Sequence, residues 1–215
     1  MLDSPMPTYR IRRATTEDVN DVVGLRIHAE EWLRAAGIEQ WTVRTTGEEM
    51  IRAQIDRGVT FVVTTGAGDT IGSLALDQAD PVFWTPDEMQ QAALYLYKFV
   101  IRSERRGSGL GDLLLDWACE RAEAAGAKFL RLDCWKTNTA LHRYYEKRGF
   151  VHYATRTAEG RKSGALFERP TSLRLVNEPA VALTGTHTGV GGRHDGTLLS
   201  VRPPVFDSAR PDATR

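Results

Sequence analysis

The chain has 215 residues, of which 41% are hydrophobic and 26% charged, a balance typical of a folded globular protein rather than a disordered one. Its 28 basic and 28 acidic side chains cancel, which removes the usual electrostatic argument for a nucleic-acid partner. No stretch approaches the ~20 consecutive apolar residues that span a bilayer, and no apolar signal region opens the chain. Neither the two cysteines nor the five histidines have the spacing of metal ligands. We therefore expect a cytoplasmic protein without membrane or metal partners.

The N-terminal half of the chain predicts two helices and three strands. A short strand at residues 9–13 precedes a helix at 15–37, which opens with hydroxyl and acidic side chains and continues with apolar residues at mostly helical spacing. A second helix is predicted to begin at Thr45. β-Branched residues then predict strands at 60–65 and 70–76, joined as a hairpin.

In the second half, the most strand-like stretch of the chain, residues 94–102, runs into a glycine-rich turn. An amphipathic helix follows the turn and ends at Gly126. The remaining predicted elements are a strand at 129–134, a helix at 138–147 and strands at 150–156 and 165–169.

The composition changes at the C-terminal end. Residues 171–215 hold five glycines, four prolines and a single aromatic residue, Phe206. Such a segment buries too little apolar surface to offset its ordering entropy. We therefore expect one domain at 8–170 and a flexible tail at 171–215, with short strands at 181–183 and 198–201 as the less favoured interpretation.

The turn between the strand at 94–102 and the following helix carries the strongest functional signal. A helix N-terminus offers unpaired backbone N–H groups and the positive end of the helix dipole, and glycines let a phosphate approach the backbone closely. The spacing, Arg106 to Gly111, is R-x-x-G-x-G. It matches neither the dinucleotide-binding G-x-G-x-x-G pattern nor a P-loop.

This turn resembles the pyrophosphate loop of the GNAT N-acetyltransferase family. The preceding FVIR at 99–102 looks like the family's bulged fourth strand, and a second block at 138–150 resembles the family's N-x-A-x-x-x-Y-Y/F-E-K-x-G-F pattern. Together the matches cover roughly residues 9–169. The resemblance implies an α/β fold with a mixed, mostly antiparallel seven-stranded sheet, whose fourth and fifth strands splay apart, flanked by about four helices.

The same resemblance implies acetyl-CoA as co-substrate. Its pantetheine arm is expected between the splayed strands, hydrogen-bonded to the backbone at Val100 and Ile101, with Asn138 binding the arm or a nearby water. The residues expected to hold the pyrophosphate are Arg106, Gly107, Ser108, Gly109, Leu110 and Gly111.

Direct acetyl transfer needs an acid for the leaving thiolate and a base for the amine. Tyr145 stands where the family's general-acid tyrosine stands; the alternative is a core aromatic residue. Many members place a glutamate where this chain has Tyr95, a poor base. Asp133 instead matches the glutamate of members that acetylate protein N-termini. Its alternatives are a salt bridge with Arg131 or Arg143, or a chain of waters replacing any single base.

The resemblance leaves the acceptor open. Aromatic residues suit a cationic amine, and the ones expected near the acceptor are Trp41, Trp84, Tyr95, Tyr97 and Trp135. The favoured function is acetylation of a small-molecule amine. The alternatives are acetylation of a protein N-terminus or lysine, and a non-catalytic CoA-binding sensor or interaction module. Dimers are common in the family, so the resemblance leaves a homodimer open.

Overall fold

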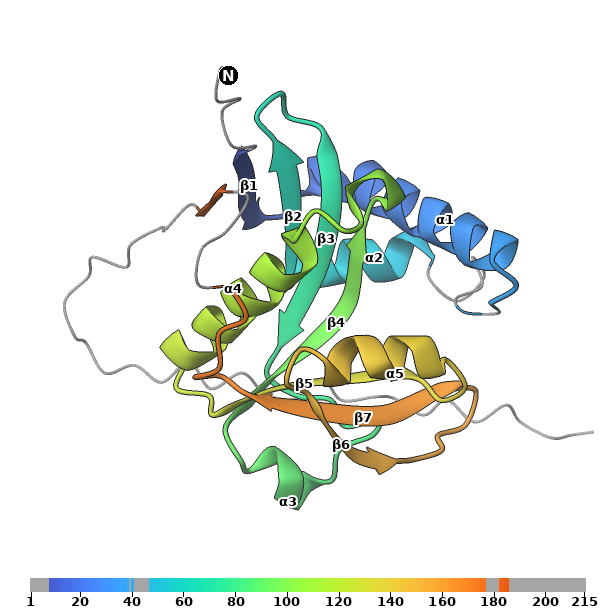
Figure 1. Ribbon diagram of the computed structural model, residues 1–215, viewed down its shortest axis with the longest axis vertical. Coiled ribbons are helices and arrows are strands. Elements are labelled where there is room, and N and C mark those ends of the chain that lie inside the picture. Colours follow the sequence, from blue (N-terminus) through green and yellow to red (C-terminus); the bar gives the residue numbers. More distant parts are fainter. Residues whose placement is uncertain (1–7, 39, 41–46, 177–181, 186–215) are drawn as a thin grey trace, which may run out of the picture.

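A computed structural model describes residues 8–38, 40, 47–176 and 182–185, which form one sheet flanked by helices (Figure 1). The strands are β1 (Thr8–Arg13), β2 (Thr60–Thr65), β3 (Thr70–Asp77), β4 (Ala93–Ile101), β5 (Phe129–Trp135), β6 (Val151–Thr155), β7 (Ser163–Pro170) and β8 (Ala182–Gly185). The α-helices are α1 (Val19–Ala35), α2 (Glu48–Asp56), α3 (Pro86–Met89), α4 (Leu110–Ala124) and α5 (Thr139–Glu146).

The strands are ordered β6-β7-β5-β4-β3-β2-β1-β8 across the sheet, and neighbours are antiparallel except for β4 with β5 and β1 with β8. Strands β1 to β7 confirm the predicted seven-stranded, mostly antiparallel sheet. β8 is an eighth strand from the segment predicted as tail, and it forms the edge of the sheet beside β1. It overlaps the less favoured strand at 181–183, whereas the one at 198–201 lies outside the described residues. Within the described residues there are five α-helices rather than four, because Thr85 caps an unpredicted single turn, α3.

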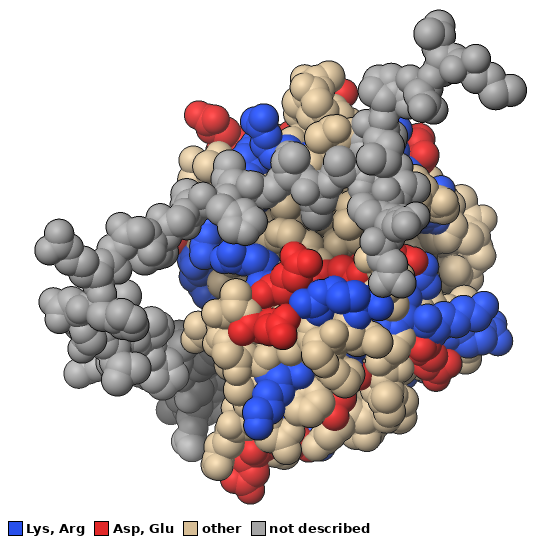
Figure 2. Space-filling model, turned by 60° about the vertical axis from the view of Figure 1, so that its left-hand side comes forward, with Lys and Arg blue, Asp and Glu red and all other residues tan. Residues whose placement is uncertain are grey.

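Helices cover both faces of the sheet (Figure 1). On one face, Leu25 and Ala29 of α1 pack on Val100 of β4, and α1 and α2 together cover Val62 of β2. On the other face lies α4. None of the described helices is long and apolar enough to cross a bilayer. Figure 2 shows basic and acidic side chains interspersed over one face of the molecule, in keeping with the balanced charge.

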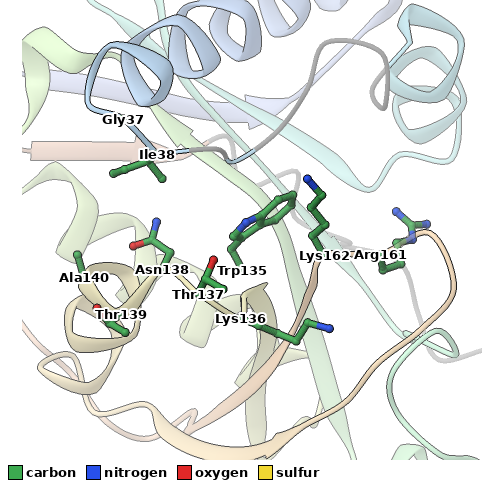
Figure 3. Close-up of a pocket in the computed structure, with 10 residues that line it drawn as sticks. All are labelled: Gly37, Ile38, Trp135, Lys136, Thr137, Asn138, Thr139, Ala140, Arg161 and Lys162. Atoms are coloured by element: carbon green, nitrogen blue, oxygen red, sulfur yellow. The ribbon is translucent and has the colours of Figure 1, made fainter.

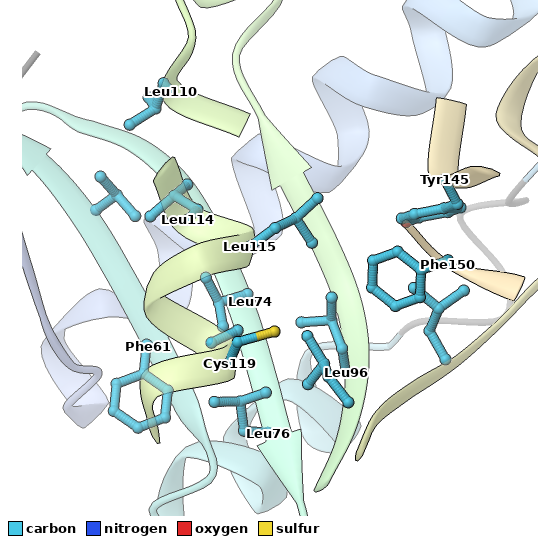
Figure 4. Packing of buried hydrophobic residues seen from close by; sticks show 14 of the residues in the cluster. Phe61, Leu74, Leu76, Leu96, Leu110, Leu114, Leu115, Cys119, Tyr145 and Phe150 are labelled. Atoms are coloured by element: carbon cyan, nitrogen blue, oxygen red, sulfur yellow. The ribbon is translucent and has the colours of Figure 1, made fainter. Parts of the chain in front are cut away.

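The main core cluster lies between α4 and the sheet (Figure 4). Leu110, Leu114 and Leu115 are each at most 1% exposed, and they face Leu74 of β3 and Leu96 of β4. Burying one leucine side chain completely stabilises a fold by about 1.5–3 kcal/mol. The start of α4, and with it the glycine turn, is therefore firmly anchored to the sheet.

β4 and β5 pair only over their first halves. The parallel register runs from Ala93 opposite Phe129 to Leu96 opposite Leu132, and no pairing continues beyond it. β4 also carries a bulge: between two neighbouring pairs β3 has one residue, Leu74, and β4 has two, Lys98 and Phe99. Lys98 at this point has φ +52°. The two strands consequently diverge after their fourth paired residue, as the family resemblance implied.

The first residues of the predicted tail pack on the domain. Asp116 of α4 is 5% exposed and accepts hydrogen bonds from the amides of Leu175 (2.7 Å) and Val176 (2.9 Å). It also accepts one from the buried Arg169 at 2.6 Å. The packed domain therefore extends at least to Val176, six residues beyond the boundary expected from composition.

Candidate active site

A cleft of about 1100 Å³ opens where β4 and β5 separate. Its walls come from the ends of these two strands, from α1, from the glycine turn and from α5. Most of the sequence-predicted site residues line it: Val100, Ile101, Arg106, Gly107, Gly109, Gly111, Asp133, Asn138 and Tyr145. Of the remaining two, Ser108 lies in the turn without lining the cleft, whereas Leu110 is fully buried in the core below it.

The glycine turn presents free backbone donors at one end of this cleft. Gly107 and Gly109 have φ values of +75° and +82°, which glycine adopts without the steric cost other residues meet. Among the described residues, the amides of Gly107, Gly109 and Gly111 donate no hydrogen bond outside the regular helices and strands, and no side chain caps α4. These amides and the positive end of the helix dipole suit a bound anion.

Two neighbouring contacts fix the position of the turn. A Cβ on Gly111 would lie 2.7 Å from the Tyr144 hydroxyl, so glycine allows α4 and α5 to approach closely. The guanidinium of Arg106 stacks on Trp32 of α1, 3.3 Å from the ring centroid. The Arg106 side chain therefore ties the turn to α1 in this structure.

Asn138 is the N-cap of α5. Its Oδ1 accepts a hydrogen bond from the Leu141 amide at 2.9 Å, and its Nδ2 donates to Oε1 of Gln40 at 2.7 Å. The side chain thus fixes the start of the helix that carries Tyr145 and links it to the segment after α1.

Tyr145 combines features of both sequence interpretations. It is 7% exposed, and its ring packs against Phe150 and Phe167 with centroids 5.3 Å and 6.3 Å away, as a core residue does. It also lines the cleft, and in the part of the chain that the structure describes its hydroxyl makes no hydrogen bond to a protein group. Burial raises the pKa of Tyr145 above its ordinary value, which keeps the phenol protonated and available as a donor.

Asp133 approaches the cleft from the opposite face of the sheet. Its neighbour Cys134 shares the α4 core cluster with Tyr145, and successive side chains of a strand point to opposite faces. Burial raises the pKa of Asp133, while a hydrogen bond with Ser163 and the charge of Arg161 oppose the rise. A buried carboxylate with a raised pKa is a better proton acceptor than an exposed one.

The predicted alternative of a salt bridge between Asp133 and Arg131 is wrong. Arg131 pairs with Glu168 of β7 at 3.2 Å, because Glu168 lies directly opposite it in the strand register. Directly opposite residues have Cβ atoms about 4.5–5.5 Å apart, closer than alternate residues on one strand at about 6.6 Å. Nor does Arg143 form an ion pair anywhere in the described ranges.

Arg131 also accounts for two aromatic residues expected beside the acceptor. Its fully buried guanidinium stacks on Trp84, 4.2 Å from the ring centroid, and donates to the Tyr95 hydroxyl at 3.3 Å. Trp84 and Tyr95 thus pack in a structural cluster and do not line the cleft. Tyr97 and Trp135 do line it, and Trp41 lies outside the described residues.

Sequence reasoning missed three charged residues that the fold brings to the cleft beside Asp133. Arg26 comes from α1, Asp80 from the connection between β3 and α3, and Lys98 from the bulge of β4. With Asp133 and Arg161 they form what we call the charged end of the cleft. Burial raises the pKa of Asp80 to about 6, and the charge of Asp133 adds to the shift. These residues stand in separate segments, so no local spacing indicated them.

A smaller opening of about 640 Å³ adjoins the charged end (Figure 3). Figure 3 shows Ile38, from the chain after α1, on one side and the connection from Trp135 to Asn138 on the other. Arg161 and Lys162, from the connection between β6 and β7, lie beside Trp135. The opening shares Trp135, Asn138 and Arg161 with the cleft and therefore continues it toward the surface.

Two other nucleophilic or basic side chains near the cleft have structural explanations. Burial raises the pKa of the Cys134 thiol to about 12, so it is not a ready nucleophile. The His142 ring lies 2.8 Å from the Trp135 carbonyl and packs on Phe167. The described residues contain no group of three or more His, Cys, Asp or Glu side chains placed to hold a metal ion.

Comparison with known proteins identifies the family to which the chain belongs. The profile of the acetyltransferase (GNAT) family matches residues 26–150. The uncharacterized N-acetyltransferase YesJ of Bacillus subtilis (strain 168) is 29% identical over 143 residues, covering 64% of this chain and 78% of its own. The chain belongs to the GNAT acetyltransferase family.

Solved structures agree in fold. A GNAT family acetyltransferase from Listeria monocytogenes has a TM-score of 0.58 at 20% identity, covering 75% of this chain and 94% of its own. The PaiA N-acetyltransferase from Thermoplasma acidophilum, solved in complex with coenzyme A, has a TM-score of 0.60 at 17% identity, covering 76% and 99%.

Proposed function

We propose that the protein transfers the acetyl group of acetyl-CoA directly to a primary amine of a small molecule. The observation that carries this proposal is the opening between β4 and β5, with a glycine turn of free amides at one end and a set of charged side chains at the other. The coenzyme A complex of the Thermoplasma acidophilum relative supports the choice of donor.

In this proposal the coenzyme runs from the glycine turn along the open edge of β4. Its pyrophosphate binds the amides of the turn from Arg106 to Gly111, and the pantetheine arm lies along the open edge of β4. The amide of Arg102 bonds the Ile71 carbonyl, at 2.8 Å, so strand alternation turns the peptide groups of Val100 toward β3 and those of Ile101 toward the cleft. Ile101 then pairs with the arm through its backbone, and Val100 helps to shape the wall.

The two catalytic groups act from opposite faces of the sheet. The ammonium group of the acceptor loses a proton to Asp133, directly or through a water, and its nitrogen then forms a bond to the thioester carbonyl carbon. The carbon–sulfur bond breaks as the intermediate collapses, and the thiolate takes a proton from Tyr145. The nitrogen releases its second proton in the same collapse, and this proton returns to Tyr145 through water. The net products are the amide, free CoA thiol and one proton. Asn138 holds α5, and thereby Tyr145, in place.

In the test, the protein is incubated with acetyl-CoA and each member of a panel of amines, and the release of free thiol is measured. The panel includes small amines, amino acids, polyamines and peptides with free N-termini or lysines. We expect turnover of at least one small amine, with saturation in both substrates. Turnover of peptides alone would replace the small-molecule acceptor by a protein. Tight acetyl-CoA binding without any turnover would favour the sensor function.

A further inference from the structure

Two cationic side chains at the charged end of the cleft have no acidic partner. The Nε atom of Arg26 is sealed from solvent and forms no hydrogen bond. The Nζ atom of Lys98 contacts the sulfur of Met50 at 3.6 Å, which is a weak acceptor. Within the ranges that the structure describes, neither side chain takes part in an ion pair.

Burial makes it unfavourable to hold these two side chains in their charged forms. Burial lowers the pKa of Lys98 to about 7, and the nearby charge of Arg26 adds to this shift. Burial lowers the pKa of Arg26 to about 10. Both shifts arise mainly because burial removes water, and for Lys98 the charge of Asp133 opposes the shift without cancelling it. An anion seated between the two side chains would oppose both shifts.

The backbone at Lys98 adds a further cost. A φ of +52° is the left-handed region, which a residue with a Cβ enters at about 1–2 kcal/mol. The bulge at this point places the lysine at the open part of β4, where the strand no longer pairs with β5. Strained backbone and an unpaired cation coincide at one residue of the cleft.

The carboxylates of the charged end come from other elements than these cations, and the charge of Asp133 reaches Lys98, where it opposes the lowering of the pKa. Asp133 comes from β5 and Asp80 from the connection after β3, and Asp80 is 5% exposed. They are close enough for the charge of Asp133 to act on Asp80. Neither forms an ion pair with Arg26 or Lys98 in the described structure. The cleft thus offers positive and negative positions that act on each other through their charges without direct ion pairing.

We propose that the acceptor is a zwitterion of the amino-acid class, whose carboxylate binds between Arg26 and Lys98 while its ammonium group faces Asp133 and Asp80. This inference rests on the proposed acetyl transfer and names its substrate class. Guanidinium and ammonium groups bind a carboxylate through charge-assisted hydrogen bonds, roughly twice as strong as neutral ones. The carboxylate would then hold the amine in register with the thioester, on the Asp133 side of the sheet.

The experiment compares each proteinogenic amino acid that is turned over with its own carboxamide, which keeps the shape and removes the negative charge. Spermidine serves as a purely cationic acceptor. We expect kcat/KM to favour the free acid by about 10–10²-fold, the range of a lost charged hydrogen-bond pair. Arg26→Gln and Lys98→Met should bring this ratio close to one, mainly by raising KM for the acid. Arg34→Gln, an exposed position of α1, is the matched control and should leave the ratio unchanged.

Two further measurements separate this inference from a structural role and from failure of the acetyl transfer. Without ligand, Lys98→Met should melt at the same or a higher temperature, because it removes a partly buried charge that forms no ion pair. Calorimetry with CoA present should detect amino-acid binding that Arg26→Gln abolishes, even if no acetyl group moves. Carboxamides or spermidine used as well as free acids, with no effect of Arg26→Gln, would overturn the inference and leave the acetyltransferase intact. Amino-acid binding without turnover would overturn the acetyl transfer instead.

Discussion

The residues just after β7 give a stability prediction that composition alone would not make. We compare a chain ending at Val176 with one ending at Pro170. The shorter chain loses the amides of Leu175 and Val176, which donate to the buried carboxylate of Asp116 at 2.7 Å and 2.9 Å. Hydrogen bonds to a charged group contribute about 1.5–3 kcal/mol each.

Water can reach Asp116 once the segment is gone, so we expect a loss of about 2–4 kcal/mol rather than the full sum. For a domain of this size that is a fall in Tm of roughly 5–15 °C. Urea unfolding of both chains, each with and without Asp116→Asn, measures the loss and its origin. Asp116→Asn should lower the free energy of unfolding by less in the shorter chain, because the two amides that donate to Asp116 are absent there. Equal stability of the two chains, or an equal cost of Asp116→Asn in both, would refute the reasoning.

Four further expectations concern the cleft. Gly109→Trp, at a residue with φ +82°, should abolish acetyl-CoA binding by calorimetry in a protein that still melts cooperatively; wild-type affinity would exclude the turn as the pyrophosphate site. Tyr145→Phe should lower kcat about 10²-fold with little change in acetyl-CoA affinity, and an unchanged single-turnover rate would remove its role as acid. Asp133→Asn should lower kcat/KM by about 10²-fold or more and abolish the acidic limb of the pH–rate profile, whereas full activity would favour a chain of waters. Burial raises the pKa of Asp80 to about 6, so the neutral carboxyl stabilises the fold below about pH 4, and this contribution is lost as the pH rises through 6. Asp80→Asn should remove this fall in the free energy of unfolding with pH and raise the free energy of unfolding at pH 7 by on the order of 1–2 kcal/mol. The same pH dependence in wild type and variant would contradict this expectation.

Local patterns predicted most of the fold. The helix before Gly126 and the strands at 60–65 and 70–76 follow from side-chain periodicity, and each agrees with the structure within a residue or two. α3 was missed because it is a single turn, set by the capping of Thr85 and not by any apolar repeat. β8 overlaps the strand near 181–183 that composition left as the less favoured interpretation, because its order depends on pairing with β1 and not on an apolar pattern of its own.

The site residues fall into two groups: those that local sequence patterns predict, and those that only the fold brings together. The turn from Arg106 to Gly111 and the position of Tyr145 could be read from contiguous motifs. The pairing of Arg131 could not, since it depends on which residue of β7 stands opposite, a fact of register and not of spacing along one strand. Arg26 and Lys98 meet for a similar reason: one belongs to a helix and the other to a strand 72 residues away, and only packing brings them to one cleft.

The extra residue in β4 also decides how the chain tolerates changes in length. Phe99 and Ile101 pack on the α4 cluster, whereas Val100 between them packs on α1. Leu96 belongs to the α4 cluster and Tyr97 to the cluster on the other face, so Lys98 is the residue that interrupts a regular alternation along β4. Deleting Lys98 would straighten the strand and leave Phe99, Val100 and Ile101 on their present faces, because the residues on either side of it then alternate regularly. Loss of this residue would therefore remove a lysine from the cleft while conserving the packing of both layers.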